Sequence, residues 1–89
     1  MHISEARAIA DAGFSHIAGD SDLVAAFMAQ SGTDVAGLTA MAGRPEFAQF
    51  VLDFLLEQDQ RVLAFAQSAG LAPQRVVMAR AVLGGGDPW

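Results

Sequence analysis

Apolar residues return every three or four positions along most of this chain, and short polar or glycine-containing breaks interrupt them. This spacing places the apolar side chains on one face of an α-helix. Ser4 is expected to cap the first helix, which continues to Ile17. Gly13 lies on the apolar face of that helix, where it would let another helix approach closely. The apolar positions of this face are Ala6, Ile9, Ala10, Gly13, Phe14 and Ile17.

Capping and stop residues predict two further helices before the first proline of the chain. Asp20 or Ser21 can cap a second helix, and Gly32 ends it. Asp34 can then cap a short third helix, which closes at Gly43. The first half of the chain is therefore expected to contain three helices.

The fourth predicted helix begins at Pro45, because proline fits the first position of a helix. It is the most apolar element of the chain, with apolar residues over most of its circumference. A helix of this kind belongs at the centre of a fold. We expect Phe50, Phe54 and Leu55 to lie in the core.

Two more helices are predicted in the second half of the chain. A polar break at Gln58 and Asp59 precedes the fifth helix, which ends at Gly70. Pro73 then starts a sixth helix, which continues to about Leu83.

These elements predict an all-α fold, a compact bundle of five or six short helices. Residues 1–83 would form a single helical domain, and residues 84–89 a flexible C-terminal tail. A shift of 38 residues overlays the two halves of the chain. This leaves open whether a three-helix unit has been duplicated or an alanine-rich chain matches itself by chance. The matching pairs are Val24 with Val62, Ala26 with Ala64, Phe27 with Phe65, and Gly32 with Gly70.

The composition also indicates that this chain has more apolar surface than a single small fold can bury. Of its 89 residues 53% are hydrophobic, and it has no cysteine. The missing cysteines exclude a disulfide framework, a thiolate zinc site and a cysteine nucleophile. The net charge is −5 and the five arginines are scattered, which argues against nucleic-acid binding and against an anionic membrane surface. We find no signal peptide and no membrane-spanning segment, so a cytoplasmic protein is expected.

The sixth predicted helix has two apolar stripes, with Arg75 and Arg80 between them. One stripe is expected to pack inward, and the other needs cover from a neighbouring helix, a second copy or another protein. Trp89, beyond three glycines, is either an anchor for a groove or part of a disordered end. The first stripe consists of Val76, Ala79 and Leu83, and the second of Val77, Met78 and Ala81. Val77, Met78, Ala81 and Trp89 are therefore the candidate interaction residues.

A helix-turn-helix pattern runs from Phe65 to Ala79, with a glycine at the turn and apolar anchors in the second helix. DNA recognition would require polar or basic side chains on the outward face of that second helix. The outward positions are instead Gln74, Val77, Met78 and Ala81. An αα-corner is therefore the better interpretation, because its turn needs glycine for the same backbone reason.

Other polar residues suggest chemistry only weakly. His16 and Asp20 have the spacing of two metal ligands on one helix face, but no third ligand follows. Asp53 and Glu57 are paired carboxylates, which are more typical of a solvated helix edge than of acid–base catalysis. We predict no catalytic residue, no metal and no cofactor.

The chain contains the segments Asp53-Phe54-Leu55-Leu56, Ala64-Phe65-Ala66, Gly70-Leu71-Ala72-Pro73, Arg80-Ala81 and a glycine-rich end with Trp89. With these segments it resembles a family of short, all-helical proteins of unknown function from alphaproteobacteria. The resemblance is strongest after Pro45 and implies a bacterial, cytoplasmic, stand-alone helical protein. It implies no activity and no functional residue. The first half departs from the family, in which a Gly-Leu-Asp-Pro turn is common, because it has Gly32-Thr33-Asp34-Val35.

The leading functional hypothesis is a non-enzymatic protein–protein interaction module that forms a homo-oligomer or binds a protein partner. The alternatives are a transcriptional regulator with a degenerate helix-turn-helix and, third, a small enzyme. Neither nucleic acid nor a membrane is expected as a partner.

Overall fold

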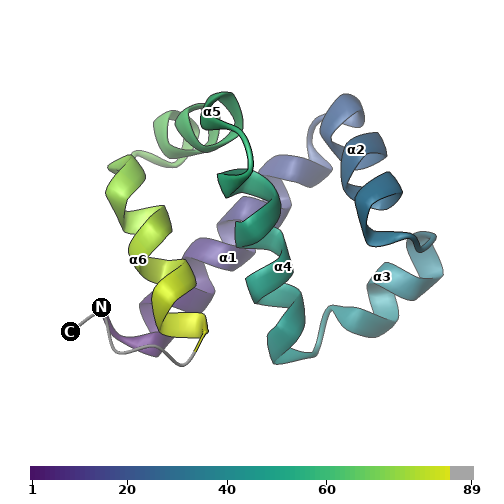
Figure 1. The fold of residues 1–89 in the computed structure, drawn as a ribbon, viewed down its shortest axis with the longest axis horizontal. Coiled ribbons are helices and arrows are strands. Elements are labelled where there is room, and N and C mark those ends of the chain that lie inside the picture. The colour runs from purple at the N-terminus through teal and green to yellow at the C-terminus, as the bar shows by residue number, and fades with distance from the viewer. Residues whose placement is uncertain (85–89) are drawn as a thin grey trace.

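The computed structural model describes residues 1–84, apart from the side chains of Val35, Thr39 and Pro45. Over this range the chain forms six α-helices and no strand, which confirms the predicted all-α fold (Figure 1). Trp89 and the remainder of the predicted tail after Gly84 lie outside the described residues. The helices are α1 (Ile3–Ala18), α2 (Ser21–Ser31), α3 (Val35–Met41), α4 (Pro45–Leu56), α5 (Asp59–Ala69) and α6 (Pro73–Leu83).

The predicted cap of α1 was wrong. The helix begins at Ile3, so Ser4 lies within its first turn and His2 occupies the capping position. The His2 Nδ1 atom accepts a hydrogen bond from the Ser4 backbone N–H at 3.1 Å, and it lies 2.8 Å from the Ser4 hydroxyl oxygen. An imidazole nitrogen thus caps the helix in place of the serine hydroxyl that we had predicted.

The other predicted helix starts are confirmed, and so are the stops at Gly32 and Gly70, but α3 ends at Met41, two residues before the predicted stop at Gly43. Asp34 Oδ1 accepts a hydrogen bond from the backbone N–H of Gly37 at the start of α3. Pro45 is the first residue of α4. Gly32 and Gly70 both adopt left-handed backbone conformations, with φ of 69° and 70°, directly after α2 and α5. Glycine enters this region without the steric cost that a Cβ atom brings, so both helices end at the residue that can turn the chain.

Asp20 is the side chain that caps α2, through hydrogen bonds from the backbone N–H groups of Asp22 at 2.9 Å and Leu23 at 3.2 Å. Asp20→Ala is expected to lower the free energy of unfolding by about 1 kcal/mol, because two N–H groups lose their acceptor. Asp22→Ala is the matched control, since it removes only a favourable charge near the helix end. Urea denaturation followed by circular dichroism should separate the two variants. Equal losses would mean that the cap contributes nothing of its own.

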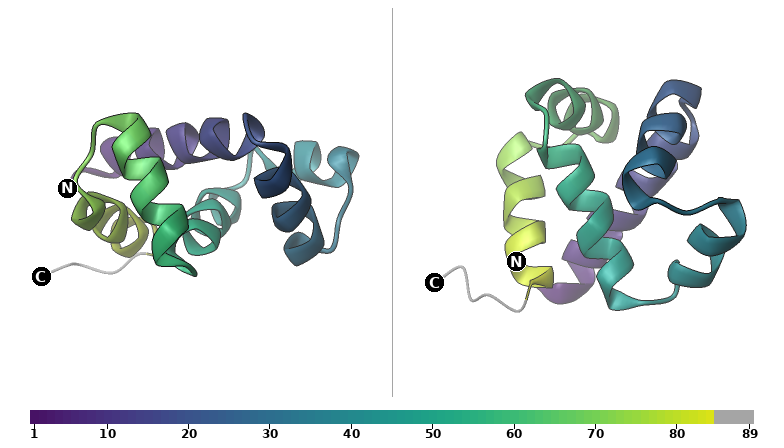
Figure 2. Two further views of the ribbon diagram at one scale, coloured as in Figure 1. Left: turned by 90° about the horizontal axis from the view of Figure 1, so that it is seen from above. Right: turned by 45° about the vertical axis from the view of Figure 1, so that its right-hand side comes forward.

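Helices α1, α4 and α6 make the most extensive contacts with one another and form the centre of the fold. Figure 2 shows α2 and α3 at one end of the molecule and α5 and α6 at the other, with α1 and α4 between them. The central role predicted for α4 is confirmed, since it supplies much of the buried surface. The largest fully buried side chains are Phe27, Phe54, Phe65, Ile17, Leu52, Leu55, Val51 and Val76.

A cluster of phenylalanine rings joins α2 to α4. The ring of Phe27, on α2, meets the rings of Phe50 and Phe54 edge to face, with centroids 5.0 and 5.1 Å apart. Such pairs add stabilisation beyond the area that they bury. Phe54 and Leu55 are fully buried as predicted, but Phe50 is only half-buried. The prediction for Phe50 was therefore too strong, because helical spacing places a residue on a face without fixing how much of it a neighbour covers.

The two halves share helix boundaries but differ in how their third helix packs. Adding 38 to the bounds of α2 (residues 21–31) gives the bounds of α5 (residues 59–69). Adding it to the first residue of α3 gives the first residue of α6. In the packing, however, α6 lies against both α1 and α4, whereas α3 makes only sparse contacts with the other helices. The boundaries agree with the predicted repeat, and the position of the third helix does not follow it.

None of the helices in residues 1–84 combines the length and the apolar character that crossing a bilayer requires.

Candidate interaction surfaces

The outer side of α6 carries exposed apolar side chains. Val77 is 56% exposed and Met78 is 39% exposed, while Ala81 is half-buried. Residues three and four positions apart adjoin on a helix surface, so Ala81 follows both Val77 and Met78 in one continuous stripe. The inner stripe packs inward as the sequence suggested, with Val76 and Ala79 fully buried and Leu83 half-buried against the core. No described helix covers the outer stripe completely.

Ion pairs engage the two arginines of α6. The guanidinium of Arg75 donates a hydrogen bond to a carboxylate oxygen of Glu5 on α1 at 2.9 Å. Arg80 donates from Nε to Asp53 on α4 at 2.5 Å. Each pair joins α6 to another helix, so each of these arginine charges already has a carboxylate partner within the chain. The outer stripe of α6 therefore lies between neutralised charges.

Leu63 on α5 extends this apolar area, and the sequence analysis did not single it out. It is 53% exposed, and it lines a shallow groove with Val77 where α5 approaches the start of α6. The sequence did contain a signal for this exposure. Leu63 directly follows Val62, so on a helix the two side chains point to different sides, and Val62 is the buried one. We call the four residues Leu63, Val77, Met78 and Ala81 the α5–α6 face. Trp89, the fourth predicted interaction residue, lies outside the described residues.

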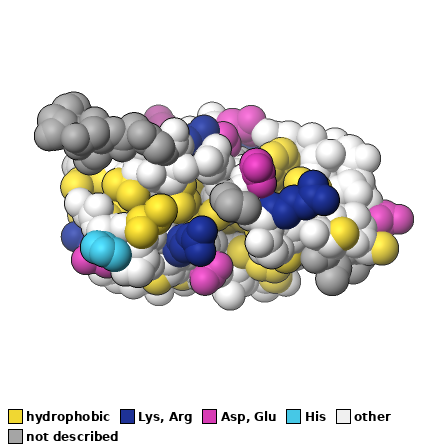
Figure 3. All heavy atoms as spheres, turned by 90° about the horizontal axis from the view of Figure 1, so that it is seen from below, with side chains coloured by type: hydrophobic (Ala, Val, Ile, Leu, Met, Phe, Trp, Pro, Cys, Tyr) yellow, Lys and Arg dark blue, Asp and Glu magenta, His cyan; other side chains and the backbone are white. Residues whose placement is uncertain are grey.

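A further exposed apolar side chain lies at the start of α1, where Ile3 is 50% exposed. Viewed from below, hydrophobic side chains gather on the end of the molecule at which α1 begins (Figure 3). Because α1 packs against α6, this area lies at one end of the α1–α6 pair.

A second apolar site, which the sequence analysis missed, lies between α1, α2 and α3. It is a half-open groove of about 280 Å³. Phe14 and Ile17 had been assigned to the apolar face of the first helix, and nothing in their spacing shows that a groove stays open beside them. We call it the α1–α3 groove. The described residues that line it are all apolar: Phe14, Ile17, Ala18, Val24, Phe27, Met28, Leu38 and Ala42.

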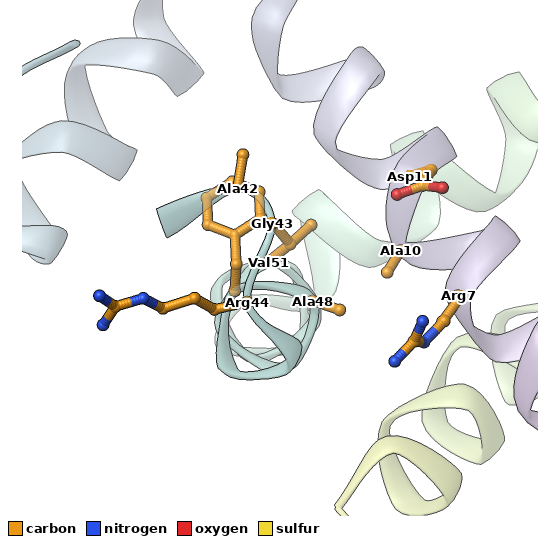
Figure 4. A pocket seen from close by; sticks show the side chains of 9 residues that line it. Arg7, Ala10, Asp11, Ala42, Gly43, Arg44, Ala48 and Val51 are labelled. Atoms are coloured by element: carbon orange, nitrogen blue, oxygen red, sulfur yellow. The ribbon is translucent and has the colours of Figure 1, made fainter. Parts of the chain in front are cut away.

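A smaller pocket of about 160 Å³ between α1 and α4 has charged residues at its edges (Figure 4). Arg7 and Asp11 lie on α1, and Arg44 lies at the start of α4. Figure 4 shows the Arg44 side chain extending away from Arg7 and Asp11. The charged groups do not converge on one point, so this geometry does not favour binding a small anion.

The carboxylates considered for acid–base chemistry have structural partners. Asp53 is paired with Arg80, and Glu57 lies 3.4 Å from the Arg61 guanidinium and accepts a hydrogen bond from Gln30. Asp53 and Glu57 are both exposed, and the interactions that they make join helices to one another. The pair thus has the helix-edge role that we preferred for it.

His16, the other candidate ligand, packs its ring against Phe65 at a centroid distance of 5.6 Å. Within the described part of the chain, no three histidine, aspartate or glutamate side chains gather into a group that could hold a metal ion.

The segment with the helix-turn-helix pattern forms two helices joined at Gly70. The backbone N–H of Leu71 donates to the Ala66 carbonyl at 2.8 Å, and that of Gly70 donates to the Gln67 carbonyl. These bonds form the paired motif that commonly ends a helix at glycine. On α6, Arg75 is already engaged with Glu5, and its neighbours Val77 and Met78 present apolar surface.

Comparison with known proteins identifies a family for this chain but no activity. Residues 3–86 match the model of a family described as "Protein of unknown function (DUF3572)". No curated protein matches this chain. No solved structure matches it either.

Proposed function

We propose that this chain, which belongs to the DUF3572 family, is a non-enzymatic protein–protein interaction module that self-associates through its α5–α6 face. The observation that supports this most directly is the clustering of exposed apolar side chains on two adjacent helices. Of the four large apolar side chains that are exposed in the described structure, Leu63, Val77 and Met78 lie on α5 and α6. Removing this surface from water favours association.

The charges around the face support pairing with an equal face. A two-fold symmetric dimer brings the same patch of both copies together, so like charges on the patch would oppose one another. The stripe of α6 instead lies between Arg75 and Arg80, each of which is already paired with a carboxylate. An apolar patch between compensated charges can meet its own copy with little electrostatic penalty.

The strength expected of such a dimer is modest. Few apolar groups are involved, and small interfaces belong to weak or transient complexes. We therefore expect a dissociation constant on the order of micromolar. Each copy carries a net charge of −5, so the two copies repel each other at long range. Added salt screens that repulsion and should strengthen the dimer.

Val77→Asp tests this proposal, because it places a charge at the most exposed apolar position of the face. The variant should be monomeric at concentrations at which the wild-type chain sediments as a dimer. Val77 is more than half exposed, so the fold should tolerate the change, and circular dichroism would verify this. Sedimentation velocity over a range of concentrations is the measurement.

Ala12→Asp is the matched control, since Ala12 is exposed on α1 outside the α5–α6 face and the variant has the same net charge. It should dimerise like the wild-type chain. A wild-type chain that remains monomeric at every concentration, or a Val77→Asp variant that still dimerises, would refute the proposed self-association.

A further inference from the structure

We infer that Met78 is a modification site, at which oxidation of the thioether to methionine sulfoxide by a peroxide separates the two copies of the dimer. Met78 belongs to the α5–α6 face, so this site rests on the self-association proposed above and would regulate it. Three observations support it: the exposure of Met78, its position within the face, and the absence of thiols from the chain.

Met78 is the most exposed of the four methionines in the chain. It is 39% exposed, whereas Met1, Met28 and Met41 are half-buried and pack against the hydrophobic core. Oxidation of a methionine is faster where the oxidant can reach the sulfur atom. A peroxide is therefore expected to oxidise Met78 first in the folded chain.

The chain offers a peroxide no thiol. It contains no cysteine, so the four methionines hold its only sulfur atoms. A cysteine thiolate would otherwise compete as a nucleophile for the oxidant. The sulfur chemistry of this chain is therefore confined to methionine, which is oxidised reversibly to the sulfoxide.

The oxidation transfers one oxygen atom to the Met78 sulfur. A lone pair of Sδ attacks one oxygen of hydrogen peroxide, so that the S–O bond forms as the O–O bond breaks. The proton on the transferred oxygen passes to the departing hydroxide, and the products are methionine sulfoxide and water. The sulfur loses two electrons and the peroxide gains them. Methionine sulfoxide reductases reverse the change with electrons from thiols, which makes the modification reversible.

The sulfoxide oxygen would lie within the apolar stripe of α6. Val77 directly precedes Met78 and Ala81 lies three positions after it, so the three side chains form one patch. A two-fold dimer buries this patch against its own copy, and an S=O group placed there loses its hydrogen bonds to water without gaining a partner. Arg75 and Arg80, the cations that flank the stripe, are already paired with carboxylates. Oxidation of both copies imposes this cost twice.

The same surface is open in the single chain and covered in the proposed dimer. With a dissociation constant on the order of micromolar, a dilute solution holds mostly monomer, in which a peroxide reaches Met78. Pairing would cover the Met78 sulfur and slow its oxidation. The rate of sulfoxide formation at Met78 should therefore fall as the chain concentration rises, while the rates at the half-buried Met28 and Met41 stay unchanged.

Oxidation of the full chain with hydrogen peroxide tests the inference. Peptide mass spectrometry of a dilute sample should show sulfoxide at Met78 several times sooner than at Met28 or Met41. Sedimentation velocity of the oxidised chain should then give a dissociation constant raised by ~10-fold or more. Methionine sulfoxide reductases with dithiothreitol should restore the original value. The circular dichroism spectrum should stay the same throughout, because the methionines that pack against the core have not reacted.

Two variants assign the effect to Met78. In Met78→Leu the position stays apolar but has no sulfur, so peroxide should change the dissociation constant of this variant by less than about twofold. The Met28→Leu/Met41→Leu variant removes sulfur atoms on α2 and α3 and leaves the α5–α6 face as it is. Its dimer should respond to peroxide as the wild-type dimer does. If Met78→Leu pairs too weakly to measure, this second variant tests the site by itself.

Several results would overturn the inference. These are oxidation of Met78 that is no faster than that of Met28 and Met41, or that does not depend on chain concentration. An oxidised wild-type chain that pairs as before, a Met78→Leu dimer that peroxide still separates, or a Met28→Leu/Met41→Leu dimer that resists peroxide would do the same. So would loss of the helical circular dichroism signal together with the dimer.

In each of these cases the untreated wild-type chain still dimerises, so the proposed self-association stands. An untreated chain that is monomeric at every concentration refutes the self-association instead, and its regulation through Met78 is then refuted as well. Sedimentation velocity before any peroxide is added therefore distinguishes the two failures.

Discussion

Phe54→Ala is expected to lower the free energy of unfolding by about 3–5 kcal/mol. The Phe54 side chain is fully buried, meets the ring of Phe27 edge to face, and has the Arg61 guanidinium 4.0 Å from its own ring centroid. Truncation removes the burial, the aromatic pair and the cation–π contact together, and it leaves a cavity in the centre of the fold. A domain of this size has only about 4–13 kcal/mol of stability to lose. Urea denaturation followed by circular dichroism measures the change.

Phe50→Ala is the matched comparison, because the ring of Phe50 also meets that of Phe27 but is only half-buried. The free energy of unfolding should fall by only about 1–2 kcal/mol, clearly less than in Phe54→Ala, since less surface leaves a nonpolar environment and water can fill the space. If the two variants lost the same stability, burial would not determine the energetics of this aromatic cluster.

Gly13→Val is expected to destabilise the chain by about 2 kcal/mol or more. A Cβ atom at Gly13 would lie 2.9 Å from Leu55 Cδ1 and 3.3 Å from Val51 Cγ1. Both neighbours are fully buried, so the two extra methyl groups of valine would push core side chains out of their preferred rotamers. The gain in helix propensity over glycine, less than about 1 kcal/mol, is too small to offset this. Thermal and urea denaturation would measure the loss.

Two control variants separate the steric effect at Gly13 from the change in helix propensity. Ala12→Val alters the adjacent exposed position and should cost only about 0.5 kcal/mol, the difference in helix propensity. Gly13→Ala should cost less than Gly13→Val, because a single methyl group displaces only the end of Leu55 and alanine favours the helix. A Gly13→Val variant as stable as the wild-type chain would show that α1 and α4 are not held at this distance by the glycine.

The helix boundaries could be predicted because local chemistry determines them. Each boundary depends on a residue that acts on the backbone within a few positions. These residues are Gly32, Gly70, Pro45, Pro73, Asp20 and Asp34. The start of α1 was predicted two residues late for the same reason. Serine is the more common cap, and only the three-dimensional structure shows that the His2 ring reaches the backbone N–H of Ser4.

The surfaces could be predicted only in part. Helical spacing identified Val77, Met78 and Ala81 as a separate stripe, and the structure places Val77 and Met78 at the surface and Ala81 half-buried. The pairing of Arg75 with Glu5 joins residues that are 70 positions apart, and no local pattern contains that information. The α1–α3 groove was missed because its residues have the pattern of a core. Whether a core residue is covered depends on where another helix packs, and for α3 that placement differs from its counterpart α6.

The extensive contact between α1 and α6 affects how this protein is made. Of the six described helices α1 is synthesised first, yet its main partner, α6, is synthesised last. Native packing of the whole bundle must therefore wait until α6 has emerged, unlike that of a domain whose neighbours in sequence are also neighbours in space. Throughout that interval the apolar face of α1 stays exposed to solvent in the nascent chain. This is the stage at which binding of a chaperone would matter most.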